Sequence, residues 1–163
     1  MLELGLKFIP IQSISGVYKL PVCSKKVWEN IQNCKSDADI SKAFGALGVS
    51  VSDIPLKERA FVLYAYIDSV KKLREDTGLE VPYYPSKKND DDIKYTIYTG
   101  LDKLVADYAN LSVYAVDDLP IFDYWLLLRD AFISKLASTK DGREYLNDAY
   151  RLTQTEADEN IEV

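Results

Sequence analysis

The densest acidic cluster in the sequence is formed by Asp90, Asp91 and Asp92, whose carboxylates are the kind of ligand that Mg²⁺ and Ca²⁺ prefer. An EF-hand loop would alternate its ligands along the chain and would supply a glycine and a late glutamate, and this cluster has no such pattern. Consecutive carboxylates also suit the N-terminus of a helix, where they are solvated and interact favourably with the helix dipole. We therefore interpret the cluster, like Asp37 and Asp39, as a helix start, and we predict no metal site there.

The residue types that act as nucleophiles or soft metal ligands are few, because the chain has two cysteines, Cys23 and Cys34, and no histidine. Two cysteines without histidine cannot supply the four ligands of a structural zinc site. The lack of histidine also removes the commonest general base and every Ser-His or Cys-His pairing, and the sequence contains no glycine-rich phosphate loop. We expect both cysteines to be reduced and partly buried. The sequence predicts no catalytic residue, no cofactor and no metal ligand, and it favours a protein that is not an enzyme.

Composition favours a folded, acidic protein of one domain. Hydrophobic residues make up 47% of the 163 residues and charged residues 28%, which is the range of globular proteins. The formal net charge of -6 opposes binding to nucleic acid or to an anionic membrane, since both need a basic surface. Basic pairs such as Lys25 and Lys26 are scattered, and we expect Lys71, Lys72 and Arg74 to form a solvated cluster near a helix C-terminus, where cations are favourable. The sequence shows neither a secretory signal nor an apolar run of membrane-spanning length, so we expect a soluble protein in the cytoplasm.

The elements that must position these residues are predicted to be mainly helices. Apolar stretches on either side of residues 13–16 predict a β-hairpin near the N-terminus. Ser24 is expected to cap a first helix, and Ser36, with Asp39 three residues later, resembles the capping box of a second helix. The fold class we expect is therefore mainly α, a compact bundle of about five to seven helices with a short N-terminal β-hairpin.

The remaining segments divide the chain into two helical halves. A third helix carries its apolar stripe on Leu56, Ala60, Leu63, Ile67 and Val70. It completes an N-terminal half at residues 1–77, which a loop or linker at 78–91 connects to the rest. A C-terminal half at 92–152, whose last helix is expected to start at Ser138, and an acidic tail at 153–163 complete what we predict to be one compact domain overall.

The segment DYWLLLRDAF, residues 123–132, belongs to a predicted helix that is apolar on nearly every side. The helix opens at Pro120, and its main stripe consists of Ile121, Trp125, Leu128, Phe132 and Leu136. A second row of Phe122, Leu126 and Ile133 leaves only a narrow polar strip. Helices that are apolar all round are usually buried at the centre of a bundle, whereas an exposed apolar face would serve a partner protein. Both interpretations remain open at this point.

Tyrosine is the most frequent aromatic residue, and its twelve copies exceed what a core of this size buries readily with every hydroxyl satisfied. Some tyrosines should therefore lie at the surface. Tyr83 and Tyr84 are flanked by prolines and could form a stiff, extended hook for a partner protein. Packing of the same loop on its own domain is the alternative.

Three segments share a layout that we associate with one class of protein. In residues 117–158 a Leu-Pro step leads into the aromatic helix, and a Gly-Arg-Glu-Tyr-Leu turn and helix follow. The segments LPVCSKKVWENI, residues 20–31, and IPLKERAFVLYAYIDSV, residues 54–70, form the N-terminal counterpart. The first layout resembles small, chaperone-like tail-assembly proteins of bacteriophages. The second is similar to tail or baseplate assembly proteins of contractile-tailed phages.

The resemblance implies a non-enzymatic assembly chaperone that binds a helical virion component, such as a tape-measure protein, in the host cytoplasm and prevents its aggregation. Apolar helices with surplus aromatic residues suit an amphipathic partner helix, and a homo-oligomer is compatible with this role. We expect the partner contacts at Tyr83, Tyr84, Phe122, Trp125 and Leu126. The main alternative is a structural adaptor that stays in the virion, in its tail, baseplate or neck. A small, histidine-free enzyme with a pocket of perturbed carboxylates is a third interpretation.

Overall fold

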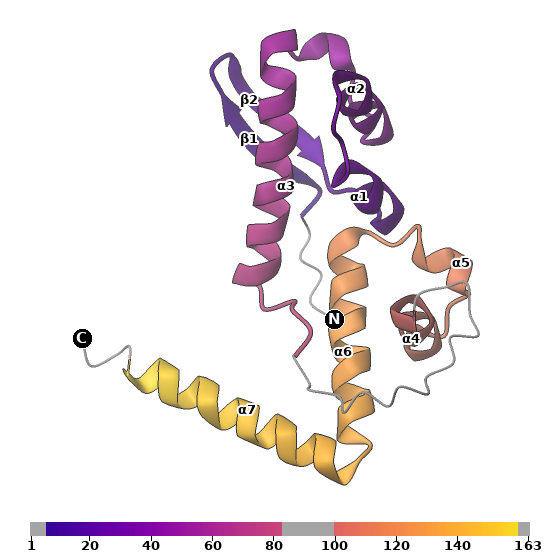
Figure 1. Ribbon diagram of the computed structural model, residues 1–163, viewed down its shortest axis with the longest axis vertical. Helices are drawn as coiled ribbons and strands as arrows, with labels where there is room; N and C mark the ends of the chain where they lie inside the picture. Colours follow the sequence, from indigo (N-terminus) through magenta and orange to yellow (C-terminus); the bar gives the residue numbers. More distant parts are fainter. Residues whose placement is uncertain (1–5, 83–99, 160–163) are drawn as a thin grey trace.

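A computed structural model describes residues 6–82 and 100–159, with side chains as far as residue 149 in the last helix. Within these ranges the chain forms one antiparallel two-stranded hairpin and seven α-helices (Figure 1). The predicted mainly α fold with a short N-terminal hairpin is therefore confirmed.

The hairpin consists of β1 (Phe8–Ser13) and β2 (Gly16–Pro21). Side chains alternate between the two faces of β1, so that Ile9 and Ile11 are buried and their neighbours are exposed. The buried face packs on the longest helix of the N-terminal half. Gly16 follows the two-residue turn with a φ of +142°, a value that favours glycine because it lacks a Cβ atom.

Two short helices follow the hairpin, α1 (Lys25–Ile31) and α2 (Asp37–Ala46). The Ser24 side chain accepts a hydrogen bond from an amide in the first turn of α1. Ser36 and Asp39 form the reciprocal capping box that their spacing predicts. Both helix starts were predictable because a cap depends on residues only three positions apart.

The central helix of the N-terminal half is α3 (Arg59–Asp76), which is preceded by the 3-10 turns η1 (Val51–Asp53) and η2 (Leu56–Glu58). The buried side chains of α3 are Val62, Leu63, Tyr66, Ile67 and Val70. The prediction that Leu56 shares this buried face is wrong, because the α-helix begins only at Arg59 and Leu56 is exposed in η2. Leu63, Ile67 and Val70 are buried as predicted, and Ala60 is partly buried against the same core.

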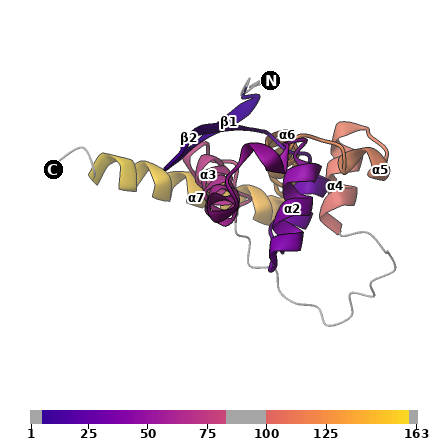
Figure 2. The ribbon, with the colours of Figure 1, turned by 90° about the horizontal axis from the view of Figure 1, so that it is seen from above.

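The C-terminal half contains α4 (Gly100–Ala109), α5 (Val113–Val116), α6 (Ile121–Ala137) and α7 (Lys140–Glu159). Helix α4 packs on one side of α6, and α7 leaves the body on the side away from α4 and α5 (Figures 1 and 2). None of the helices within the described ranges combines the length and the apolar character that crossing a bilayer requires.

The start and end of α7 differ from the prediction. Ser138 is the C-cap of α6, and Thr139 instead caps α7, because its Oγ1 accepts a hydrogen bond from the Gly142 N–H at 3.1 Å. The helix continues to Glu159, so most of the expected tail at 153–163 is helical. The acidic cluster at 90–92, the Tyr83–Tyr84 hook and most of the expected linker lie outside the described residues.

The two halves are joined by backbone hydrogen bonds and by a shared core. The Lys25 N–H donates to the Leu119 carbonyl and the Ile121 N–H donates to the Cys23 carbonyl, each at 2.9 Å. These bonds fix the start of α1 against the start of α6. Buried side chains of the hairpin, of α3 and of α6 belong to one hydrophobic cluster, so the halves do not have separate interiors.

Candidate protein-binding site

An apolar hollow opens between the tip of the hairpin and the start of α3. It has a volume of about 460 Å³ and a mainly apolar wall. The residues that line it are Gln12, Ser13, Ile14, Lys57, Glu58 and Phe61. We refer to it as the hairpin-tip hollow.

Two apolar side chains flank this hollow at the surface. Ile14, in the two-residue turn of the hairpin, is 93% exposed, and Phe61, on the outer side of α3, is 56% exposed. Turns usually take Gly, Asn, Asp or Ser because those residues suit the backbone and the solvent. An isoleucine at this position gains neither advantage, and together with Phe61 it gives the hollow an exposed apolar rim.

A buried carboxylate holds the tip in place. The Ser13 hydroxyl donates to Glu58 Oε2 at 2.6 Å, the Ser15 N–H donates to the same oxygen at 3.3 Å, and the Ser15 hydroxyl donates to Oε1. These hydroxyl and amide donors hold the pKa of Glu58 below its usual value. Because Glu58 is committed to the turn, Lys57 is the charged side chain that the hollow presents to a ligand. The hollow can bind an apolar group beside an anion.

The aromatic helix α6 is a core helix. Phe122 is 4% exposed and Trp125 is 5% exposed, and the Trp125 ring makes edge-to-face contacts with Phe122 at 5.6 Å and with Trp28 at 5.5 Å between centroids. The Arg74 guanidinium lies 4.7 Å from the same ring. Of the two interpretations of DYWLLLRDAF, the structure supports the buried one.

The expected partner contacts are corrected accordingly. Phe122 and Trp125 are not offered to a partner in this fold, because they fill the interior between α6 and α1. Leu126 is partly buried and packs against the same core. Tyr83 and Tyr84 lie outside the described residues. Sequence reasoning missed the hairpin-tip hollow, and the one local signal for it was an isoleucine in a predicted turn.

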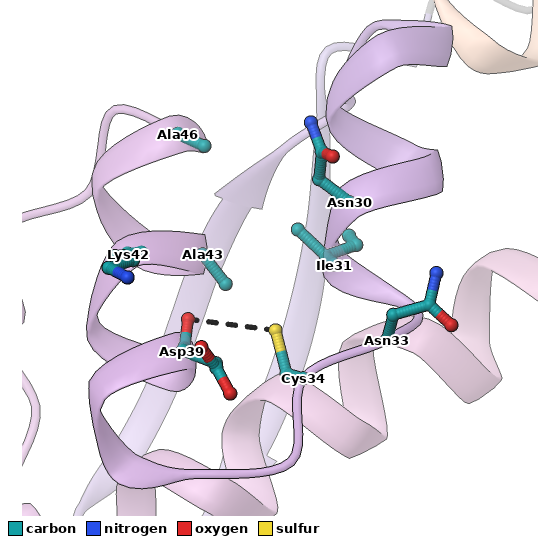
Figure 3. A pocket seen from close by; sticks show the side chains of 8 residues that line it. All are labelled: Asn30, Ile31, Asn33, Cys34, Asp39, Lys42, Ala43 and Ala46. Carbon is teal, nitrogen blue, oxygen red and sulfur yellow. Dashed lines mark hydrogen bonds between the residues drawn. The ribbon is translucent and has the colours of Figure 1, made fainter.

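A second hollow lies between α1 and α2 and has a volume of about 360 Å³ (Figure 3). Cys34 faces it, and its thiol donates to the Asp39 carbonyl at 3.6 Å. Burial and the negative charge of Asp39 raise the pKa of the Cys34 thiol, which keeps it protonated and unreactive at neutral pH. The Asp39 carboxylate is engaged in the capping box of α2. This hollow therefore has the character of a packing gap between two helices.

Lys25 forms an ion cluster that the sequence did not predict. Lys25 is 4% exposed, and its Nζ lies 3.1 Å from Glu29, 3.3 Å from Asp102 and 3.1 Å from Asp117. The Tyr124 hydroxyl donates to the other oxygen of Asp102 at 3.0 Å. Burial favours the neutral amine, but the three carboxylates outweigh it and hold the pKa of Lys25 above its usual value. The cluster ties α1 to the C-terminal half.

Within the described ranges, no three His, Cys, Asp or Glu side chains gather in a way that could hold a metal ion. No family model matches the chain, and the comparisons with curated proteins and with solved structures found no match.

Proposed function

We propose that this protein is a non-enzymatic protein-binding factor whose hairpin-tip hollow receives an apolar side chain of a helical partner. The observation that carries the proposal is Ile14, which is almost fully exposed beside the hollow, in a turn whose residues Ser13 and Ser15 are hydrogen-bonded to Glu58. An anchor that is ordered before binding loses little conformational entropy when it is covered.

A helical partner suits the size and chemistry of the hollow. An amphipathic helix presents apolar side chains at three- and four-residue spacing, and one of them, of leucine or phenylalanine size, would lie between Ile14 and Phe61. An acidic residue on the next turn of such a helix would pair with Lys57 at the rim.

The resemblance to tail-assembly proteins of bacteriophages supports a biological setting for this binding. In that setting the partner is a long helical virion component, such as a tape-measure protein, and the protein acts as an assembly chaperone. A structural adaptor would use the same hollow but would remain in the finished particle.

The test is affinity purification of the tagged protein from its native cells, with mass spectrometry, for the wild type, Ile14→Ser and Phe61→Ser. Leu101→Ser, at a partly exposed leucine of α4, is the matched control. We expect a predominantly helical protein to be recovered with the wild type and Leu101→Ser and to be lost with both hollow variants, all four having native circular dichroism. Equal recovery with all four proteins, or recovery of no such protein, would contradict the proposal.

The same samples separate the two settings. A chaperone is expected to be absent from purified particles, whereas an adaptor is expected there in a fixed ratio to the other components. Quantitative mass spectrometry of particles decides between them, and presence at fixed stoichiometry would overturn the chaperone role while leaving the binding site intact.

A further inference from the structure

The face of the hairpin that points away from α3 is apolar and exposed. Phe8 is 53% exposed and Val17 is 56% exposed. Directly opposite residues of an antiparallel pair lie on the same face, so the register places Pro10 with Lys19 and Gln12 with Val17 on this side. In Figure 2 both strands lie along the edge of the body, with α3 on their inner side. We refer to the surface formed by Phe8, Pro10, Gln12, Val17 and Lys19 as the outer hairpin face.

The hairpin is locally basic, although the formal net charge of the whole chain is -6. Residues 6–22, which contain both strands, include Lys7 and Lys19 and no acidic residue. Both lysines are exposed, and Lys19 lies on the outer hairpin face itself. At the adjoining hollow, the charge of Glu58 offsets that of Lys57. The excess positive charge is therefore on the hairpin, beside its exposed apolar side chains, and it suits a ligand that is both apolar and anionic.

The outer hairpin face is continuous with the hairpin-tip hollow. Gln12 belongs to both, because it lies opposite Val17 in the register and also lines the hollow. Phe8 and Ile14 are six residues apart along the chain, which corresponds to roughly 20 Å at about 3.3 Å per residue of strand. A helix that rises 5.4 Å per turn covers this length in about four turns.

The backbone favours a helix over an added strand as the ligand of this region. Within the described residues the sheet has two strands, so each strand has an unpaired edge. Pro10, in the middle of β1, has no N–H to donate to a third strand. A helix that lies across the face makes its contacts with side chains and needs no such donor.

We propose that the partner helix of the hairpin-tip hollow continues along the outer hairpin face as an acidic amphipathic segment of about four turns. Its apolar side chains contact Phe8 and Val17, and one of its carboxylates pairs with Lys19. This inference rests on the proposed function, because it concerns the same partner. It adds the chemistry of that partner and a second contact region outside the hollow.

The first measurement compares recovery of the partner from native cells by the tagged full-length wild type, Phe8→Ser and Lys19→Glu. Lys135→Glu, at an exposed lysine near the end of α6, is the matched charge control, and Leu101→Ser is the apolar control. We expect about tenfold less of the partner with Phe8→Ser and with Lys19→Glu, since the latter places like charges opposite each other. Both controls are expected to recover as much as the wild type, and all five proteins to have native circular dichroism.

Cross-linking of the wild-type complex with a carbodiimide tests the chemistry of the partner, because this reagent joins a lysine amine to a carboxylate in contact with it. We expect mass spectrometry to find Lys19 joined to an Asp or Glu of the partner. The partner segment that carries this residue is expected to have apolar residues at three- and four-residue spacing. A cross-linked segment without that spacing would contradict a helix, and cross-links at Lys57 without any at Lys19 would confine the contact to the hollow.

The two proposals fail separately in these measurements. A helical partner that Ile14→Ser loses, but that Lys19→Glu and Phe8→Ser recover like the wild type, would overturn the outer hairpin face and leave the hollow as the binding site. Recovery of no helical partner by any of the proteins would overturn both proposals.

An anionic membrane is the other surface that combines apolar and negatively charged groups. Sedimentation with vesicles of phosphatidylcholine and phosphatidylserine tests it, and we expect the wild type to remain in the supernatant. Sedimentation of the wild type with these vesicles that is lost in both Phe8→Ser and Lys19→Glu would assign the outer hairpin face to a membrane and overturn the protein partner.

Discussion

Replacing Lys25 by methionine is expected to lower the free energy of unfolding by about 2–3 kcal/mol. The carboxylates that lose their cation are not equally affected, because the side chains of Glu29 and Asp117 are 59% and 46% exposed and can be solvated by water. The Asp102 side chain is only 12% exposed, so its charge would remain in a poorly solvated place. Removing one partner of a fully buried pair costs roughly 3–5 kcal/mol, and the Tyr124 hydroxyl, which still donates to Asp102, reduces that cost.

The assay is urea unfolding followed by circular dichroism at neutral pH, with the midpoint and slope compared between variants. The double variant Lys25→Met with Asp102→Asn removes the residual charge and keeps an acceptor for Tyr124. We expect it to recover most of the lost stability, since methionine fills the space of the lysine stem. If the double variant were as unstable as Lys25→Met alone, the buried charge of Asp102 would not be the cause and the reasoning would be refuted.

Two further predictions concern the core and the hairpin tip. Phe122→Ala should lower the free energy of unfolding by about 3–5 kcal/mol because it empties part of the aromatic core, whereas Ile14→Ala should change it by less than about 0.5 kcal/mol. If urea unfolding gave the two variants the same loss of free energy, the burial of Phe122 and the exposure of Ile14 would both be contradicted. The pKa of Glu58 is lower in the folded than in the unfolded chain. The ionised carboxylate therefore contributes to the free energy of unfolding at pH values above the usual pKa of glutamate, and this contribution is lost as the pH falls through the pKa of Glu58 in the folded chain. The stability difference between the wild type and Glu58→Gln should therefore shrink on acidification, and a difference that grows would have the wrong sign.

The elements that local residues specify were predictable from the sequence. Ser24 and the pair Ser36 and Asp39 start their helices through contacts three residues away, and the apolar stretches around residues 13–16 form the expected hairpin. The start of α7 shows the limit of this reasoning, because Ser138 and Thr139 are adjacent and both are able to cap a helix.

The candidate site depends on contacts that no short pattern contains. Glu58 holds a turn that lies 43 to 45 residues earlier in the chain, and Lys25 pairs with Asp102 at a separation of 77 residues. Because α6 is apolar on nearly every side, its sequence predicted that other structure covers it. The spacing of apolar residues does not show whether the cover is formed by the chain's own helices or by a partner protein. The burial of Phe122 and Trp125 shows that the chain's own core covers this part of α6. The proposed interface is therefore at Ile14 and Phe61, which are exposed.

The junction between the halves also has a consequence for synthesis of the chain on the ribosome. The N–H groups of Lys25 and Lys26, in the first turn of α1, donate to the carbonyls of Leu119 and Asp117. Those carbonyls leave the exit tunnel more than ninety residues later than the two lysines that donate to them, as the residue numbers show. Until then these donors must be satisfied by water, and Trp28 lacks the ring of Trp125 against which it packs. The first helix of the N-terminal half, α1, is thus the last part of that half to gain all of its contacts. A nascent chain that stalls before α6 would leave the apolar side of α1 exposed to the folding machinery of the cell.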